Sequence, residues 1–108
     1  MLPKVNRVNK KGVDLLFKEG RIINFPSLTF RFKKNSGNKN LQISFIASKS
    51  IAKLAVKRNF LRRLGYRAFQ KHQADFPAGI MGVFVFRKLE KNIAVIENEI
   101  KNLLNKIN

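Results

Sequence analysis

The stretch Ile80-Met-Gly-Val-Phe-Val-Phe86 is a nearly continuous apolar run, rich in β-branched and aromatic residues. It follows a break at Phe76-Pro-Ala-Gly79, where proline and glycine interrupt regular structure. A short apolar run of this composition is typical of a strand that is covered on both faces. We therefore predict that residues 80–86 form the central strand of a sheet, and that the rest of the chain packs around it.

Two further strands are predicted earlier in the chain. Residues 28–33 (Leu-Thr-Phe-Arg-Phe-Lys) alternate apolar and polar side chains, which is the period of a strand with one buried face. Residues 41–46 (Leu-Gln-Ile-Ser-Phe-Ile) form a second stretch of strand length. The polar segment at residues 34–40 predicts a turn between them, so we expect these two strands to form a hairpin.

Three helices complete the expected fold. A short helix is predicted at residues 9–20, with Gly20 at its C-terminal end. A long basic helix is predicted at about residues 51–72, and an amphipathic helix at residues 90–107. The order α-β-β-α-β-α predicts an α/β (α+β) two-layer sandwich around a small mixed sheet. A length of 108 residues suits a single domain spanning 1–108.

The helix at residues 51–72 has a narrow apolar stripe. Leu54, Leu61 and Ala68 recur at seven-residue spacing and Leu64 lies beside them, so we expect these four side chains to face the core. Gly65 interrupts the helix at a cost of about 1 kcal/mol relative to alanine. Two explanations stay open: the glycine permits close approach of another backbone, or it is a tolerated local weakness.

The charge of the chain points to a polyanionic partner. The net charge is +17, and no Asp or Glu occurs from Arg21 to Ala74, a span that carries 13 Lys and Arg residues. A protein that needed only solubility would mix the two signs of charge. Basic globular domains of this size mostly bind nucleic acid, and a membrane-surface or heparin-type partner is the minor alternative.

The basic helix carries the strongest signal for nucleic-acid contact. Arg58 and Arg62 are one turn apart, as are Arg63 and Arg67. A helical face that is merely solvated usually contains glutamate for i,i+4 pairing, and this helix has none. Forked guanidinium groups also suit phosphate geometry. Strands rather than a helix-turn-helix precede this helix, which disfavours a DNA-binding module that uses a major groove.

The sequence offers little material for catalysis by protein side chains. It has no Cys, and its one histidine, His72, cannot build a metal site alone. Its six acids are scattered, and no phosphate-binding glycine loop occurs, so we predict no catalytic residue, no metal ligand and no small-molecule substrate. No apolar run reaches the length of a membrane span and the N-terminus lacks a signal-peptide core, so a cytoplasmic protein is expected.

Phenylalanine is unusually frequent, with ten residues and no tryptophan. Most are expected in the core. Phe30 and Phe32 share one face of the strand at residues 28–33, and two interpretations stay open for them. They could pack in the core, or they could stack on unpaired bases from an open sheet face, as in many proteins that bind single-stranded RNA.

Short segments distributed over nearly the whole chain together resemble the protein subunit of bacterial ribonuclease P. These segments are Leu2-Pro-Lys-Val-Asn-Arg7, Phe17-Lys-Glu-Gly-Arg21, Ile43-Ser44, Ser48-Lys49, Ala55-Val-Lys-Arg-Asn59, Leu61-Arg-Arg63 and the apolar strand closed by Arg87. Each segment alone is weak evidence for the resemblance, and the order and spacing of the segments make it specific.

The resemblance implies a non-catalytic protein subunit of an RNA-based endoribonuclease. In that family the RNA subunit performs the cleavage, while the protein binds the catalytic RNA and the 5′ leader of precursor tRNA and lowers the requirement for Mg²⁺, which acts through the RNA. The implied RNA-binding residues are Lys57, Arg58, Asn59, Arg62, Arg63 and Arg67. The implied leader-binding cleft contains Phe17, Phe30, Phe32, Ser48, Lys49 and Lys53. The family fold also implies a left-handed crossover connection, an exception to the usual rule.

Three positions depart from the family pattern. Phe60 replaces the second Arg of the Arg-Asn-Arg motif, Leu64-Gly-Tyr66 stands where more basic residues often follow, and Val13 stands where an aromatic leader contact is common. The alternative hypothesis is a structural RNA-binding protein, such as a ribosomal component, which would share the charge but not the dependence on a tRNA leader.

Overall fold

The computed structural model describes residues 7–34 and 40–107. The predicted segment Leu2–Asn6 and most of the predicted turn (35–39) lie outside these residues. The helices and strands are α1 (Lys10–Glu19), β1 (Arg21–Asn24), β2 (Leu28–Lys34), β3 (Gln42–Ile46), α2 (Ala55–Gln70), the short 3-10 helix η2 (Gln73–Asp75), β4 (Ile80–Phe86) and α3 (Ile93–Ile107). The order differs from the prediction by one additional strand, β1.

The sheet has the strand order β1-β2-β4-β3, so β4 is a central strand as predicted. It pairs antiparallel with β2 and parallel with β3, which confirms a mixed sheet. The predicted hairpin between β2 and β3 is wrong, because β4 lies between them. The hairpin is formed instead by β1 and β2, and β1 escaped prediction because it is a four-residue, mostly exposed edge strand without an alternating pattern.

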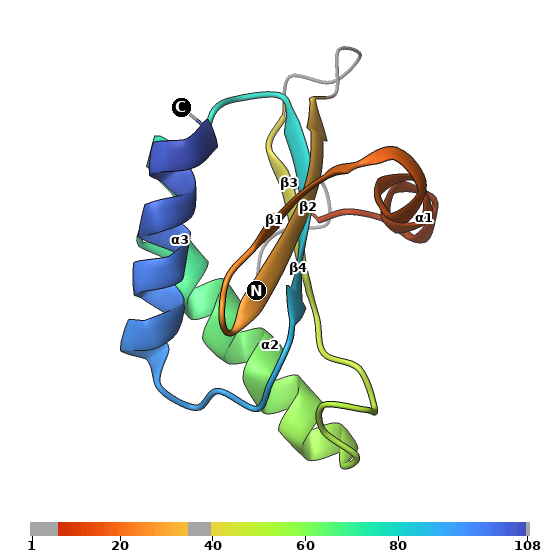
Figure 1. Ribbon diagram of the computed structural model, residues 1–108, viewed down its shortest axis with the longest axis vertical. Coiled ribbons are helices and arrows are strands. Elements are labelled where there is room, and N and C mark those ends of the chain that lie inside the picture. Colours follow the sequence, from red (N-terminus) through yellow and green to blue (C-terminus); the bar gives the residue numbers. More distant parts are fainter. Residues whose placement is uncertain (1–6, 35–39, 108) are drawn as a thin grey trace.

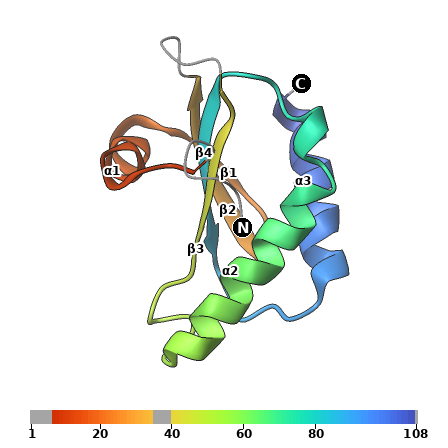
Figure 2. The same ribbon diagram turned by 180° about the vertical axis from the view of Figure 1, so that it is seen from behind.

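Helices lie on both faces of the sheet (Figures 1 and 2), and the buried apolar residues form two clusters of unequal size. Helices α2 and α3 cover one face and form the main core with it, which confirms the predicted layering of helices on a sheet. Helix α1 lies on the opposite face, where Leu16 packs against Met81 and Val83 of β4. β3 and β4 are joined through α2, and the left-handed sense of that crossover stays a prediction.

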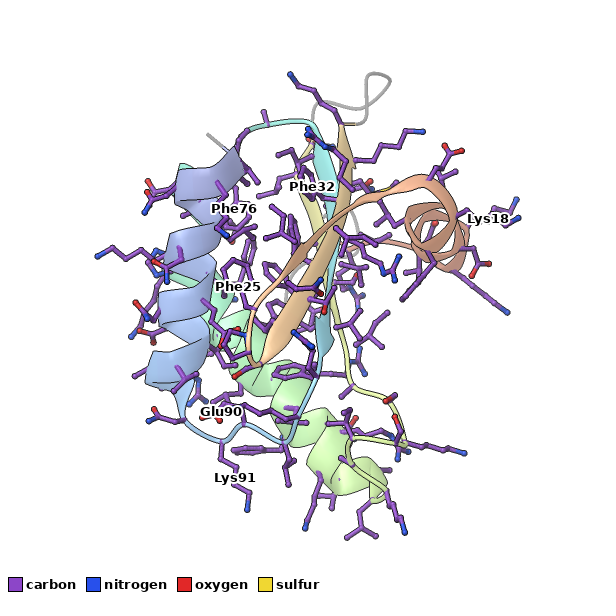
Figure 3. The ribbon with its side chains drawn as sticks, in the orientation of Figure 1. Lys18, Phe25, Phe32, Phe76, Glu90 and Lys91 are labelled. Carbon is purple, nitrogen blue, oxygen red and sulfur yellow. The ribbon has the colours of Figure 1, made fainter. Side chains whose placement is uncertain are left out.

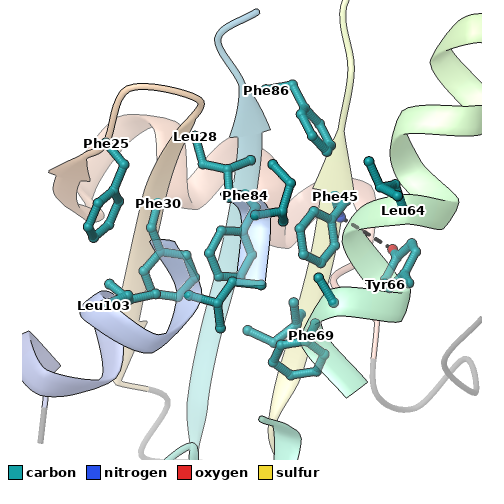
Figure 4. Packing of buried hydrophobic residues seen from close by; sticks show 14 of the residues in the cluster. Phe25, Leu28, Phe30, Phe45, Leu64, Tyr66, Phe69, Phe84, Phe86 and Leu103 are labelled. Carbon is teal, nitrogen blue, oxygen red and sulfur yellow. Dashed lines mark hydrogen bonds between the residues drawn. The ribbon is translucent and has the colours of Figure 1, made fainter. Parts of the chain in front are cut away.

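Aromatic rings from three neighbouring strands fill the centre of the main core (Figure 4). Phe84 of β4 lies between Phe30 of β2 and Phe45 of β3, with ring centroids 4.4 Å and 4.7 Å apart, respectively. All three side chains are at most 2% exposed. This row of rings holds the two sheet neighbours of β4 in register, because each ring fills the space beside the next.

The basic helix α2 begins at Ala55, four residues later than predicted. Leu54 precedes it and is 58% exposed, so its assignment to the core stripe is wrong. Leu61, Leu64 and Ala68 are buried as predicted. The apolar stripe therefore starts one turn into the helix, and the first turn projects beyond the core.

Gly65 is explained by close packing, although the neighbour is a side chain rather than a backbone. A Cβ atom at this position would lie 2.3 Å from the ring of Phe45. Helix α2 thus packs directly against the aromatic ring of Phe45 in β3. Any larger residue would push the helix away from the sheet.

Helix α1 is capped at both ends, and an ion pair links its last residue to the sheet. Its N-cap is Asn9, whose side chain accepts a hydrogen bond of 2.8 Å from the backbone N–H of Gly12. Its predicted C-terminal residue, Gly20, donates its backbone N–H to the carbonyl oxygen of Leu16. An ion pair joins Glu19 to Lys33 of β2, and this hydrogen-bonded ammonium group holds the pKa of Glu19 below its ordinary value.

Candidate nucleic-acid interface

The predicted RNA-binding residues lie along one helix and reach the protein surface. Lys57, Asn59, Arg63 and Arg67 are exposed, whereas Arg58 and Arg62 are half-buried. In the described part of the chain, carboxylate ion pairs join Lys33 to Glu19 and Lys71 to Glu97. None involves a basic side chain between Lys57 and Arg67, so the charge of α2 is left for an external anion.

Arg58 differs from its neighbours because its guanidinium group also braces the backbone. Its Nη1 donates hydrogen bonds of 3.0 Å and 2.8 Å to the carbonyl oxygens of Ala52 and Lys53. Helix α2 has no side-chain N-cap, and these contacts fix the turn that leads into it. A guanidinium carries five N–H donors, so Arg58 can hold the turn and still offer donors to a phosphate.

A groove of about 510 Å³ lies at the free edge of β3 and is lined from both α1 and α2, which Figure 2 shows on opposite sides of β3. Its lining comes from the segment before α1, from α1, from β3 and from α2, and includes Arg7, Val13, Ser44, Ile46, Arg62 and Tyr66. Arg7 and Arg62 supply positive charge from two different segments of the chain. An apolar wall with two guanidinium groups suits an extended, negatively charged strand.

The side chains of Tyr66 and Ser44 form hydrogen bonds along the edge of β3 that borders this groove. The hydroxyl of Tyr66 accepts a 3.3 Å hydrogen bond from the backbone N–H of Phe45 (dashed in Figure 4). The Ser44 hydroxyl accepts a 2.8 Å hydrogen bond from the N–H of Val8 and donates to the carbonyl oxygen of Val8 at 3.3 Å. The Ser44–Val8 hydrogen bonds hold the segment that carries Arg7 beside β3, and this segment forms one side of the groove.

Phe17 of α1 lies one helical turn after the groove residue Val13. It does not itself line the groove, and its side chain is 45% exposed. The guanidinium carbon of Arg31 lies 4.5 Å from the centre of its ring, an attractive cation–π arrangement. Phe17 and Arg31 therefore form an aromatic and cationic surface where α1 meets β2.

Phe30 and Phe32 were predicted in the same cleft, and the structure corrects that placement. Phe30 is fully buried, and Phe32 stacks on it with ring centroids 5.1 Å apart. Both belong to the face covered by α2 and α3, where Figure 3 labels Phe32, Phe25 and Phe76 on the α3 side of the sheet. The sheet separates them from Phe17, so of the two open interpretations core packing holds for both.

Ser48, Lys49 and Lys53 are all exposed in the connection between β3 and α2. The connection is compact: the carbonyl oxygen of Ser48 accepts hydrogen bonds from the N–H groups of Ile51 and Ala52, both 3.1 Å long. It continues directly from Ala47, which lines the groove. These three residues therefore follow the groove in the chain without lining it, whereas Phe17 lies on α1.

Sequence reasoning missed Arg7, Arg31 and Tyr66 as site residues. Arg7 had a signal, since it closes the opening segment that carries the family resemblance. Arg31 had a weaker one, because it alternates with the buried Phe30 and so faces the other side of β2. Tyr66 had none, since its role depends on β3 being an edge strand.

Two features of the described residues bear on other kinds of site. They contain no group of three or more His, Cys, Asp or Glu side chains that could hold a metal ion. None of their helices combines the length and the hydropathy that crossing a bilayer requires.

Comparisons with known proteins agree with the sequence resemblance. A family model described as Ribonuclease P matches residues 2–108. The RNase P protein of Staphylococcus aureus has a similar fold, with a TM-score of 0.81, 19% identity and coverage of 95% of each chain. The RNase P protein of Thermotoga maritima gives a TM-score of 0.80 at 22% identity, covering 94% of this chain and 97% of that one. No curated protein sequence matches.

The family match covers almost the entire chain, and the solved structures share its order of layers. These findings support the ribonuclease P hypothesis and not the alternative of a ribosomal component. The chain therefore belongs to the ribonuclease P family and is a protein subunit of that RNA-processing endonuclease.

Proposed function

We propose that this protein binds the catalytic RNA of ribonuclease P and the 5′ leader of precursor tRNA, and that the RNA performs the cleavage. The observation that carries the proposal is the exposed basic face of α2, which has no carboxylate partner in the described chain and adjoins a groove containing two guanidinium groups. A structured RNA offers phosphates to the helix, and a single-stranded leader suits the groove.

The basic face of α2 and the groove bind different RNAs in this proposal. In this proposal Arg63 and Arg67, which are exposed one turn apart on α2, contact phosphates of the catalytic RNA. Arg62 lies on the groove side of the same helix and, with Arg7, contacts phosphates of the leader. The surface formed by Phe17 and Arg31 gives a leader base an aromatic ring on which to stack.

Mg²⁺ belongs to the RNA in this proposal. RNA phosphates are hard oxygen ligands of the kind that Mg²⁺ prefers, and the described residues offer no acidic cluster. The protein contributes cations instead: its basic residues reduce repulsion between phosphates where leader and catalytic RNA meet. Less Mg²⁺ is then needed to reach the same screening. A cytoplasmic location is part of the proposal and rests on these RNA partners alone.

The experiment is cleavage of a precursor tRNA by a bacterial ribonuclease P RNA at low Mg²⁺, with and without the protein. We expect stimulation with the correct mature 5′ end, and no cleavage by protein alone. Arg62→Ala should weaken binding of precursor tRNA more than binding of mature tRNA, which has no leader. Lys101→Ala on α3, an exposed charge change away from the groove, serves as the matched control. Tight RNA binding without stimulation would contradict the proposal.

A further inference from the structure

A second, smaller groove lies outside the surfaces described so far. It has a volume of about 270 Å³ and is lined by Val56, Lys57 and Phe60 of α2 and by Leu89 and Lys91 of the connection between β4 and α3. We call it the Phe60 groove. Figure 3 labels Lys91 on that connection, which passes close to α2 before it enters α3.

The floor of the Phe60 groove is apolar and exposed. Val56 is 70% exposed, Phe60 is 46% exposed and Leu89 is 37% exposed. None of the three belongs to either apolar cluster of the sheet. Three exposed apolar side chains that meet at one place indicate a contact surface.

The rim of the groove is cationic. Lys57 and Lys91 line it from two separate elements, and neither forms an ion pair within the described residues. An apolar occupant alone would leave both ammonium groups without a counter-charge as it excludes water from them. A nucleotide satisfies both halves of the groove, since its base has an apolar face and its phosphates are anionic.

The groove also continues the basic surface of α2. Val56, Phe60, Arg63 and Arg67 follow the spacing i, i+4, i+7 and i+11, which places them on one stripe of the helix, and all four are exposed. A strand whose phosphates follow Arg63 and Arg67 toward the start of the helix next reaches Phe60. The stripe therefore offers phosphate contacts in its second half and a stacking surface in its first.

We propose that the Phe60 groove binds one unpaired base of the catalytic RNA, which stacks on the ring of Phe60 while the adjoining phosphates lie against Lys57 and Lys91. This inference rests on the proposed function, because it takes the catalytic RNA as the occupant. It adds a base-stacking contact to a helix whose other contacts are with phosphates.

The first test uses the absence of tryptophan from this chain. Phe60→Trp introduces a single indole whose fluorescence reports directly on stacking. On saturation with ribonuclease P RNA we expect the emission to be quenched and the indole to become protected from acrylamide. Asn105→Trp, on an exposed position of α3, is the matched control and should stay accessible. An indole at position 60 that stays accessible in the saturated complex overturns the inference and leaves the groove to a protein partner.

The second test measures affinity for the same RNA. Loss of one stacked base should weaken binding about tenfold in Phe60→Ala, whereas Phe60→Tyr should bind like the wild-type protein. Equal affinity of Phe60→Ala and wild type overturns the inference while the proposed function stands. Failure of the wild-type protein to bind the RNA removes the proposed function and, with it, this inference.

Discussion

At the scale of single residues, the arginines of α2 have different structural roles. Arg58 donates to the carbonyl oxygens of Ala52 and Lys53, whereas Arg63 is exposed without a carboxylate partner in the described chain. Arg58→Ala should therefore lower the free energy of unfolding by about 1–2 kcal/mol and also weaken RNA binding. Arg63→Ala should change stability by less than about 0.5 kcal/mol and weaken RNA binding only. Urea denaturation and RNA titration of both variants separate the two effects, and equal stabilities would contradict the bracing role.

Gly65 provides a second prediction at this scale. Alanine is the better helix former by about 1 kcal/mol, yet its Cβ would lie 2.3 Å from the ring of Phe45. We expect the clash to prevail, so that Gly65→Ala lowers the free energy of unfolding by about 1–3 kcal/mol. Thermal unfolding measures the change, with Asn59→Ala on an exposed position of the same helix as control. A Gly65→Ala variant more stable than wild type would mean that α2 moves away from β3 without cost.

The predictability of these residues from the sequence depended on how local their roles are. Leu61, Leu64 and Ala68 were placed in the core correctly, because helical spacing alone defines their face. The bracing role of Arg58 could not be foreseen, since it requires the chain to leave the helix before Ala55. Leu54 was misplaced for the same reason.

At the scale of elements, a buried carboxylate links α3 to the start of β2. Glu99 is 6% exposed and accepts hydrogen bonds of 3.1–3.2 Å from the backbone N–H groups of Ser27 and Leu28. Glu99→Ala leaves both buried donors without that acceptor, and we expect a loss of about 2–4 kcal/mol of stability. Glu99→Gln retains one acceptor oxygen and should lose less.

Urea denaturation of the Glu99 variants, with Asn98→Ala as the exposed neighbouring control, tests this link. A Glu99→Ala variant as stable as Asn98→Ala would show that water replaces the carboxylate at no cost. RNA binding should be unaffected by any of the three changes, because Glu99 lies on α3 and outside both the groove and the basic face of α2.

The same scale shows where the prediction of strands succeeded and failed. Alternation correctly placed Phe30 and Phe32 on one face of β2, but it could not tell which side of the sheet the helices cover. It also could not identify strand partners, so β2 was paired with β3 although β4 lies between them. The leader-binding cleft was therefore assigned to the wrong face for these two residues, while the assignment of Ser48, Lys49 and Lys53 to it stays a prediction.

At the scale of the whole molecule, the net charge of +17 allows two modes of RNA binding. A diffuse field would attract RNA over the entire surface, whereas a defined interface concentrates phosphate contacts on α2 and the groove. The structure favours the second mode, because the acids at Glu97 and Glu99 lie on α3, while α2 has none. Each phosphate contact that is lost should reduce the slope of log K against log salt concentration by about 0.7–0.9.

Removing two contacts from α2 should therefore have a larger effect than removing charge elsewhere. We expect the double variant Arg63→Ala and Arg67→Ala to reduce the salt slope by about 1.5, since two counterion-releasing contacts disappear. Lys101→Ala combined with Lys10→Ala removes the same formal charge from exposed positions on α3 and α1 and should leave the slope nearly unchanged. Binding to ribonuclease P RNA is measured from about 50 to 200 mM salt. Equal reductions in the two double variants would mean that the RNA senses total charge rather than the basic face of α2.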